Sequence, residues 1–461
     1  MKQSILKIKS ISVGLCLASL YACSLNIPPQ DQFSDPDAIT NVTNARSLLA
    51  SAYSSFPHYE YEFSLLGNDF VPTSLSIKDV SVLNLYNWND KEISKLAPTL
   101  WIDYYNVIAQ CDGLLERMNS VKTETTNEEK EKLAITSEAK TLKALCYLQL
   151  LRIFAPAYDA NPDAPGVILK SQLGIESKQR SSIRECVVKI KEWLTDAAQV
   201  NNTSSRNGWC SQDAVQYLLA DLALYSGDYQ GAIDAGAKIL AKSNDAYFTV
   251  EGINSLWATN SYSGRIFAFN ITSTYYASIQ YSVQEGDYFM INPQLSFCSS
   301  DVRKDSFVYP FLMNGSVREL LGKYNRCNKL NQPTAYINIM RYAGAYYIVS
   351  EAYCRRGDTE AARTLINHYW HCIGVAEAPS GISNKALLDL IMVDKQREFI
   401  GEGVNFFDLK RTHSVDLKRQ SQWGNGIVCS VSSDDYRWTF PIPVSEYRFN
   451  KVEQNPGWSS N

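Results

Sequence analysis

Two stretches of the chain share a pattern that predicts pairs of antiparallel helices. In residues 213–241, an apolar run rich in Ala and Leu leads to Gly227, and a second apolar run follows shortly after it. Residues 342–373 repeat this order, with Gly357 at the turn. Small side chains let two helices approach closely, and glycine permits the tight turn between them. This pattern limits the fold to classes built on packed helices.

Earlier segments carry the periodicity of amphipathic helices. Apolar side chains recur at steps of three and four residues from about 98 to 121, and similar patterns follow at 127–154 and 185–200. The two clear pairs resemble tetratricopeptide units, although they lie about 130 residues apart rather than in tandem. We therefore expect a mainly α fold, an α/α superhelix in which tetratricopeptide-like helix pairs form a scaffold over about 98–245 and 334–402.

The composition changes between these helical parts. Residues 246–333 are rich in Ser, Asn, Tyr and Gly, and residues 60–90 are similar. Short alternating runs such as Arg265–Ile271 predict strands among long loops. Loops on a rigid scaffold often carry binding residues, so we expect these two regions to hold the ligand surface of a single domain that spans 38–461.

The amino terminus has the properties of an export signal. Lysines precede an apolar run from Ile11 to Leu20, which is too short to cross a bilayer as a helix. The run ends in Leu-Tyr-Ala-Cys, which resembles the bacterial lipobox, a signal whose cysteine becomes the acylated first residue of the mature protein. We expect residues 1–22 to be a signal peptide, Cys23 to be lipidated, and residues 23–37 to form an extended, lipidated tether.

Charge and side-chain chemistry exclude some classes of function. The formal net charge is −4, with a pI of about 5.8, whereas binding to nucleic acid needs a basic surface. His368, His371 and Cys372 are potential metal ligands near one helical face, but no acidic fourth ligand lies nearby in the sequence. We expect no nucleic-acid partner, no metal and no cofactor.

Several motifs, in the same order along the chain, are similar to those of the SusD/RagB family of outer-membrane nutrient-binding lipoproteins of Bacteroidetes. They are Glu138–Tyr147 (EAKTLKALCY), Arg341–Ala352 (RYAGAYYIVSEA), Asp394–Gly403 (DKQREFIGEG), Phe407–Arg411 (FDLKR), Phe440–Glu446 (FPIPVSE) and Gln454–Trp458 (QNPGW). Two positions depart from the family pattern: Val404-Asn405 stands where Arg is common, and Trp458 replaces a Tyr. With the lipobox, the resemblance covers almost the whole chain.

This resemblance implies a protein that binds but does not catalyse. Members of the family are anchored by lipid to the outer membrane at the cell surface, partner a SusC-like TonB-dependent transporter and capture oligosaccharides for nutrient uptake in polysaccharide utilisation. RagB-like members bind peptides instead, which is the first alternative. A remote alternative is a glycoside hydrolase, because Glu398 and Glu402 lie four residues apart on a predicted helix and two carboxylates could act as acid and nucleophile. A structural motif in which Arg397, Lys410 or Arg411 neutralises the two acids explains the same spacing.

Binding a sugar calls for an aromatic plane over the ring and polar groups at its edge. In residues 84–90, Asn84, Tyr86, Asn87 and Trp88 combine these chemistries in a predicted loop. A second candidate surface contains Trp257, Tyr275, Tyr276 and Tyr288. The resemblance adds Asp69, which matches an acidic position of the family. Each of these residues is a candidate ligand contact, and packing against the scaffold is the alternative for each.

Overall fold

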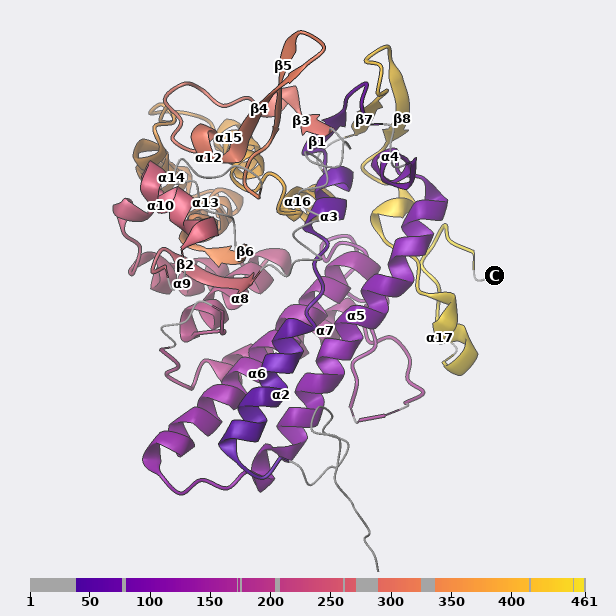
Figure 1. The fold of residues 1–461 in the computed structure, drawn as a ribbon, viewed down its shortest axis with the longest axis vertical. Helices are drawn as coiled ribbons and strands as arrows, with labels where there is room; N and C mark the ends of the chain where they lie inside the picture. Colours follow the sequence, from indigo (N-terminus) through magenta and orange to yellow (C-terminus); the bar gives the residue numbers. More distant parts are fainter. Residues whose placement is uncertain are drawn as a thin grey trace, which may run out of the picture.

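The computed structural model describes residues 39–76, 80–171, 173–174, 176–203, 208–259, 262–270, 289–324, 336–413, 416–450 and 452–459. Within these ranges the chain is mainly helical with a few short strands, which confirms the predicted fold class. Figure 1 shows long helices in the lower part of the molecule, whereas shorter helices and small β-hairpins gather at its upper end. Among the described residues, no helix is both long and apolar enough to cross a bilayer.

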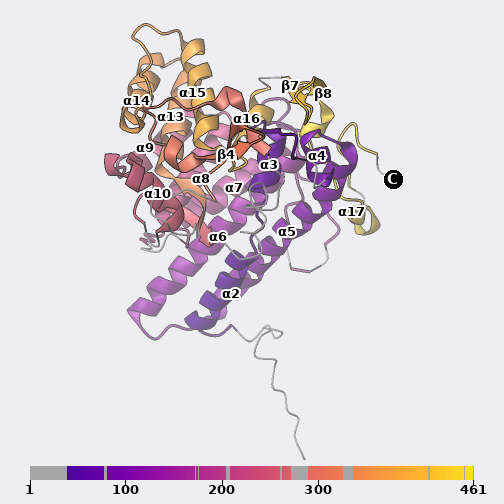
Figure 2. The ribbon, with the colours of Figure 1, turned by 45° about the horizontal axis from the view of Figure 1, so that its top comes forward.

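The long helices pack side by side. They are α2 (Val42–Ser54), α5 (Asp90–Arg117), α6 (Thr126–Phe154) and α7 (Ile183–Ala197). Helix α2 packs against α5 and α6, and α6 also contacts α7 (Figures 1 and 2). Helix α5 begins eight residues earlier than its periodicity predicts, because the Asn89 side chain caps it by accepting from the Lys91 backbone N–H at 3.0 Å.

The two predicted helix pairs form and also pack on each other. The first pair is α8 (Gln212–Tyr225) with α9 (Tyr229–Leu240), and the second is α13 (Tyr342–Arg356) with α14 (Thr359–Ile373). Gly357 ends α13 in a left-handed conformation with φ of 88°. Helix α13 packs against both α8 and α9. The close approach depends on glycine, because a Cβ at Gly344 would overlap Tyr217 of α8, and one at Gly236 would overlap Val349 of α13.

Residues 60–90 differ from the sequence expectation of strands and loops. Outside residues 77–79, which the structure does not describe, this segment forms two helices before α5, namely α3 (Glu60–Leu66) and α4 (Val80–Tyr86), and one short strand, β1 (Phe70–Pro72). Each helix has seven residues, which is too short to show a clear apolar period and too short to be stable alone. Tertiary packing stabilises them instead, since α3 buries five of its seven side chains.

The strands pair in antiparallel, two-stranded sheets. Among the described residues these sheets are β1 with β3 (Phe289–Ile291), β2 (Arg265–Asn270) with β6 (Tyr336–Arg341), β4 (Val308–Met313) with β5 (Ser316–Leu321), and β7 (Leu417–Gln420) with β8 (Ile427–Val431). The remaining elements are η3 (Met118–Ser120), η4 (Asp245–Phe248), α10 (Val250–Ala258), η5 (Pro293–Leu295), α12 (Lys304–Phe307), α15 (Asn384–Glu398), α16 (Val404–Thr412), η6 (Tyr436–Trp438) and α17 (Val444–Phe449).

The carboxyl-terminal segment is hydrogen-bonded to the carboxyl-terminal end of α6. The Phe440 backbone N–H donates to Ile153 O at 3.0 Å, and Asn455 Nδ2 donates to Phe154 O at 2.8 Å. The same Asn455 amide donates to Phe440 O at 2.6 Å. The QNPGW stretch therefore supplies a donor to the last turn of a long helix, where backbone carbonyls have no partner within the helix.

Candidate functional site

A shallow hollow of about 450 Å³ lies where the turn between α4 and α5 meets β8 and η6. This hollow, the 87–91 hollow, is lined by Asn87, Trp88, Asn89, Asp90, Lys91, Val428, Cys429 and Arg437. Figures 1 and 2 both show α4 beside the β7–β8 hairpin. The hollow therefore contains part of the segment 84–90 that the sequence singles out, together with residues about 340 positions later.

Trp88 is the anchor of this turn rather than a sugar platform. Its side chain has no exposed area, and its ring contacts Trp438 with centroids 4.5 Å apart at an angle of 70°. Trp88 Nε1 donates to Leu66 O at 3.3 Å, and Arg437 Nη1 donates to the Trp88 backbone O at 2.7 Å. Because protein atoms cover the ring, the predicted stacking role is wrong for this conformation.

Tyr86 is also buried and links α4 to β7. The Arg419 guanidinium lies 4.9 Å from its ring centroid, and its hydroxyl accepts from the Gln420 backbone N–H at 3.2 Å. Burial raises the pKa of the Tyr86 hydroxyl, which therefore stays protonated at neutral pH. The expectation that Tyr86 presents its ring to a ligand is contradicted by this burial.

Two of the three amide side chains in this segment are predicted ligand contacts, and both remain partly accessible. Asn84 and Asn87 are both half-buried. Asn87 Oδ1 is a buried atom that has no hydrogen-bond partner among the described residues, and Asn87 lines the hollow. Buried polar atoms are rarely left unpaired in proteins, so the lack of a partner at this oxygen is unusual.

Two exposed aromatic side chains, which the sequence prediction missed, belong to the chain segments that contribute Val428, Cys429 and Arg437 to the hollow. Tyr436 is 37% exposed and directly precedes Arg437 in η6. Trp423 is 62% exposed in the turn that joins β7 to β8. Tyr436 Oη donates to Asp90 Oδ2 at 2.7 Å. Partial burial and this bond to Asp90 raise the pKa of Tyr436 to about 12. The signal for Trp423 was present, since it stands among Ser, Gln, Asn and Gly in residues 421–426, the same mixture that marks residues 84–90.

The remaining candidates do not join the hollow. Asp69 is fully buried and accepts from Gln396 Nε2 and the Gly401 backbone N–H, both at 3.1 Å. Burial raises its pKa to about 7 in spite of these bonds. Trp257 is fully buried against Phe307, with ring centroids 5.5 Å apart. Trp257 therefore packs in the interior, and Asp69 accepts hydrogen bonds from other parts of the chain. Tyr275, Tyr276, Tyr288 and Cys23 lie outside the described residues.

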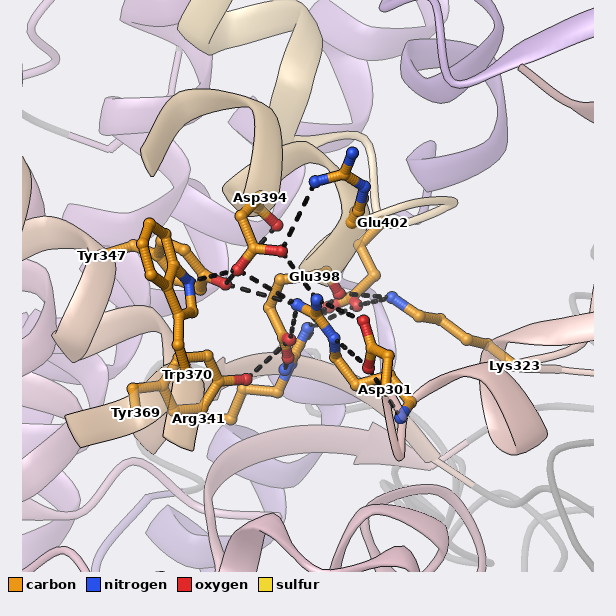
Figure 3. Close-up of polar contacts among 11 residues, drawn as sticks. Asp301, Lys323, Arg341, Tyr347, Tyr369, Trp370, Asp394, Glu398 and Glu402 are labelled. Carbon is orange, nitrogen blue, oxygen red and sulfur yellow. Dashed lines mark hydrogen bonds and ion pairs between the residues drawn. The ribbon is translucent and has the colours of Figure 1, made fainter. Parts of the chain in front are cut away.

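Glu398 and Glu402 belong to a buried ion-pair network, which Figure 3 shows. Arg341 forms ion pairs with both carboxylates. Arg303 Nη1 lies 3.0 Å from Glu398 Oε2, and Lys323 Nζ lies 2.6 Å from Glu402 Oε1. The two acids do not share a helix, because α15 ends at Glu398 and left-handed glycines flank Glu402.

This network contradicts the hydrolase alternative. Burial would raise the pKa of Glu398, but the charges of Arg341, Arg303 and Lys323 outweigh that effect and lower it to about 2. A general acid needs a raised pKa and access to substrate, and Glu398 and Glu402 are 2% and 9% exposed. The interpretation of Glu398 and Glu402 as neutralised acids of a structural motif is therefore favoured.

The cations that neutralise the two acids are not the ones expected from the sequence. Lys410 instead donates to Arg152 O at 2.7 Å, and Arg411 pairs with Glu351 and Asp408, each at 2.6 Å. Arg397 Nη1 lies 3.8 Å from Asp394 Oδ1. Arg397 directly precedes Glu398 on α15, so its side chain leaves the helix in another direction, whereas Lys410 and Arg411 belong to the next helix, α16.

Comparison with known proteins was consistent with the fold. A family model described as SusD family matches residues 192–458, and one described as Starch-binding associating with outer membrane matches residues 28–220. A putative sugar binding protein from Bacteroides vulgatus has a TM-score of 0.76 at 20% identity, with coverage of 91% of this chain and 99% of that chain. A SusD superfamily protein from Bacteroides thetaiotaomicron has a TM-score of 0.74 at 20% identity, with coverage of 90% and 100%. No curated protein matches the chain.

Proposed function

Because the chain belongs to the SusD family, we propose that it captures oligosaccharides without cleaving them and delivers them to a TonB-dependent, SusC-like transporter of the outer membrane. One of the similar solved structures is named a SusD-like carbohydrate binding protein, from Bacteroides vulgatus. A model described by starch binding matches the amino-terminal part of the chain. Both descriptions favour a sugar over a peptide as the ligand.

The observation that carries the proposal is the chemistry of the 87–91 hollow. It combines the unpaired Oδ1 of Asn87 with the charged side chains of Asp90 and Arg437. These groups suit the hydroxyls at the edge of a sugar ring, and the exposed rings of Tyr436 and Trp423 suit its less polar face. Burying about 50 to 100 Å² against one ring contributes about 1 to 2.5 kcal/mol, so each ring matters to affinity.

The test is titration of purified protein with glycans that it binds on an array. Tyr436→Ala and Trp423→Ala should each weaken binding about tenfold, the equivalent of about 1.4 kcal/mol. Leu312→Ala is the matched control, because Leu312 is 70% exposed on the separate β4–β5 hairpin. Unchanged affinity in both aromatic variants would remove the hollow from the binding site. Binding of peptides but not glycans would favour the RagB-like alternative.

Attachment and partnership extend the same proposal. Lipidation of Cys23 would hold the protein at the outer membrane, with residues 23–37 as a tether, since two or more acyl chains give stable anchoring. Cys23→Ser should release the protein from the membrane fraction, and the released variant should still bind glycan. Retention of Cys23→Ser in the membrane fraction would contradict a lipid anchor.

A further inference from the structure

Three potential metal ligands from distant parts of the sequence lie together on the surface. They are Asp245, at the start of η4, and His368 and Cys372, in the last turns of α14. One ligand atom from each lies within 4.8 Å of the others. His368 Nε2 and Asp245 Oδ1 are 3.0 Å apart. The acidic ligand that the local sequence lacks is therefore supplied by a segment 123 residues earlier.

The spacing within α14 suits metal binding. Residues four apart lie on the same face of a helix, about 5 to 6 Å apart at Cβ, and two ligands at this spacing form zinc sites in other helices. His371, three residues from His368, does not join the cluster, because its Nδ1 lies 3.3 Å from Glu377 Oε1. His371 and its partner Glu377 therefore lie apart from the face of α14 that carries His368 and Cys372.

Packing holds η4 against α14. Phe248 of η4 is buried, and its ring meets the edges of Tyr346 and Tyr369 at centroid distances of 5.6 and 5.0 Å. The Tyr346 ring also stacks on His368, at 6.0 Å and an angle of 25°. The Asn244 side chain caps η4 by accepting from the Ala246 N–H at 2.9 Å. These contacts place the Asp245 carboxylate against His368 without any metal.

We propose that Asp245, His368 and Cys372 bind one zinc ion, with the fourth coordination position open to solvent. Zinc accepts carboxylate, imidazole and thiolate ligands in tetrahedral geometry, in which the ligand atoms are about 3.3 to 3.8 Å apart. The observed atoms need shifts of about 1 Å or less to reach that geometry, which side-chain rotation provides. Carboxylate and thiolate together balance the two positive charges of the ion.

The ligand set selects zinc over the hard cations. Calcium takes six to eight oxygen ligands and magnesium prefers oxygen in octahedral geometry, whereas this cluster offers one carboxylate, one nitrogen and one sulfur. The His368 and Asp245 side chains are 50% and 66% exposed, so zinc can enter from solvent and one position remains free for water or for an atom of a partner. Figures 1 and 2 both place α14 on the opposite side of the molecule from β7 and β8. The zinc site is therefore independent of the 87–91 hollow.

Calorimetric titration of the whole protein with zinc chloride, in a reducing buffer, tests the proposal. We expect one equivalent of zinc per chain. Cys372→Ser and His368→Ala should each weaken binding by about a hundredfold or more, because loss of even an outer partner of a ligand costs 10- to 100-fold. His371→Ala and Cys298→Ser are the matched controls, since both residues are exposed and lie outside the cluster, and both should retain wild-type affinity.

A second measurement reports the sulfur directly. Cobalt(II) substituted for zinc should show thiolate-to-cobalt charge-transfer absorption in the wild-type protein and in both controls, and should lose it in Cys372→Ser. Thermal melts of Cys372→Ser, His371→Ala and Cys298→Ser without metal should coincide with that of the wild type, because these side chains are partly or largely exposed. Absence of zinc binding by the wild-type protein, or binding that survives in Cys372→Ser, would overturn the proposal. Loss of binding in either control to the same extent would overturn it as well.

Discussion

Trp88 combines a left-handed backbone with a completely buried side chain. Its φ is 57°, a conformation that is rare for a large residue and needs support from its surroundings. The support comes from the ring contacts with Trp438 and Phe406 and from the bond of Nε1 to Leu66 O. The residue therefore fixes the shape of the turn that forms the 87–91 hollow, although no part of its ring is exposed.

We expect Trp88→Ala to lower the free energy of unfolding by about 3–5 kcal/mol, the usual cost of removing a buried large aromatic side chain. Urea denaturation measures this loss. Trp423→Ala is the matched control, because Trp423 is 62% exposed and its removal should change stability by less than about 0.5 kcal/mol. A stable Trp88→Ala protein with weakened glycan binding would instead restore the role of sugar platform.

Glu398 receives one hydroxyl and two guanidinium groups in the interior. Tyr369 Oη donates to its Oε2 at 2.7 Å, while Arg303 and Arg341 provide the charges. Removing one partner of a buried ion pair leaves the others uncompensated, which costs about 3–5 kcal/mol. We expect that loss for Glu398→Gln in chemical denaturation.

The control for this substitution is Glu360→Gln. The Glu360 side chain is 67% exposed and pairs with Arg363 at 2.8 Å, and exposed pairs contribute about 0–1 kcal/mol. Equal effects of the two substitutions would show that burial of the Glu398 network adds nothing to stability.

At the scale of elements, the contact between α8 and α13 depends on the absence of one side chain. A Cβ at Gly344 would lie 2.8 Å from Tyr217 Cζ and would overlap its hydroxyl. We expect Gly344→Ala to destabilise the protein by about 1–3 kcal/mol through overpacking, seen as a lower midpoint in urea. Gly113→Ala in α5 is the control, since its new Cβ would meet only the flexible end of Arg117, at 3.1 Å. That substitution should be neutral or stabilise by up to about 1 kcal/mol.

The sequence predicts elements well where an apolar stripe is long. Helices α13 and α14 begin and end within one residue of their predicted bounds, because about four turns of periodic apolar side chains precede a glycine. It fails for α3 and α4, whose seven residues are helical through contacts with distant segments. Strand pairs such as β2 with β6, whose strands start about 70 residues apart, leave no local signal of their partner.

The candidate site could be predicted in kind but not in detail. Composition identified residues 84–90 as a mixture of rings and amides, but it could not show which side chains face inward. Trp438, 350 residues later, covers the ring of Trp88. Glu398 and Glu402 are neutralised by Arg341, Arg303 and Lys323 rather than by the cations next to them in the sequence. The cluster with Asp245 has the same origin, since only the fold brings η4 to α14.

At the scale of the whole molecule, buried acids respond to pH in opposite directions. Asp69 is fully buried, and burial raises its pKa to about 7 although Gln396 and Gly401 donate to it. Glu398 is held near 2 by the surrounding cations, whose effect exceeds that of burial. These carboxylates link β1, the GEG turn and the helix pairs, so their protonation states affect the stability of the assembled fold.

We expect the free energy of unfolding contributed by Asp69 to rise as the pH falls from about 7 to about 4, because the folded protein takes up a proton that the unfolded chain takes up only near pH 3.9. Below about pH 4.3 the contribution of Glu398 falls, since the unfolded chain is protonated there while the folded protein stays ionised to about pH 2. Each slope is at most about 1.4 kcal/mol per pH unit for one proton.

Urea denaturation between pH 3 and pH 8 measures both contributions. The difference in the free energy of unfolding between wild type and Asp69→Asn should widen from pH 7 to pH 4. The difference between wild type and Glu398→Gln should narrow below pH 4.3. Differences that stay constant with pH would contradict these assignments, because unlinked groups change stability equally at every pH.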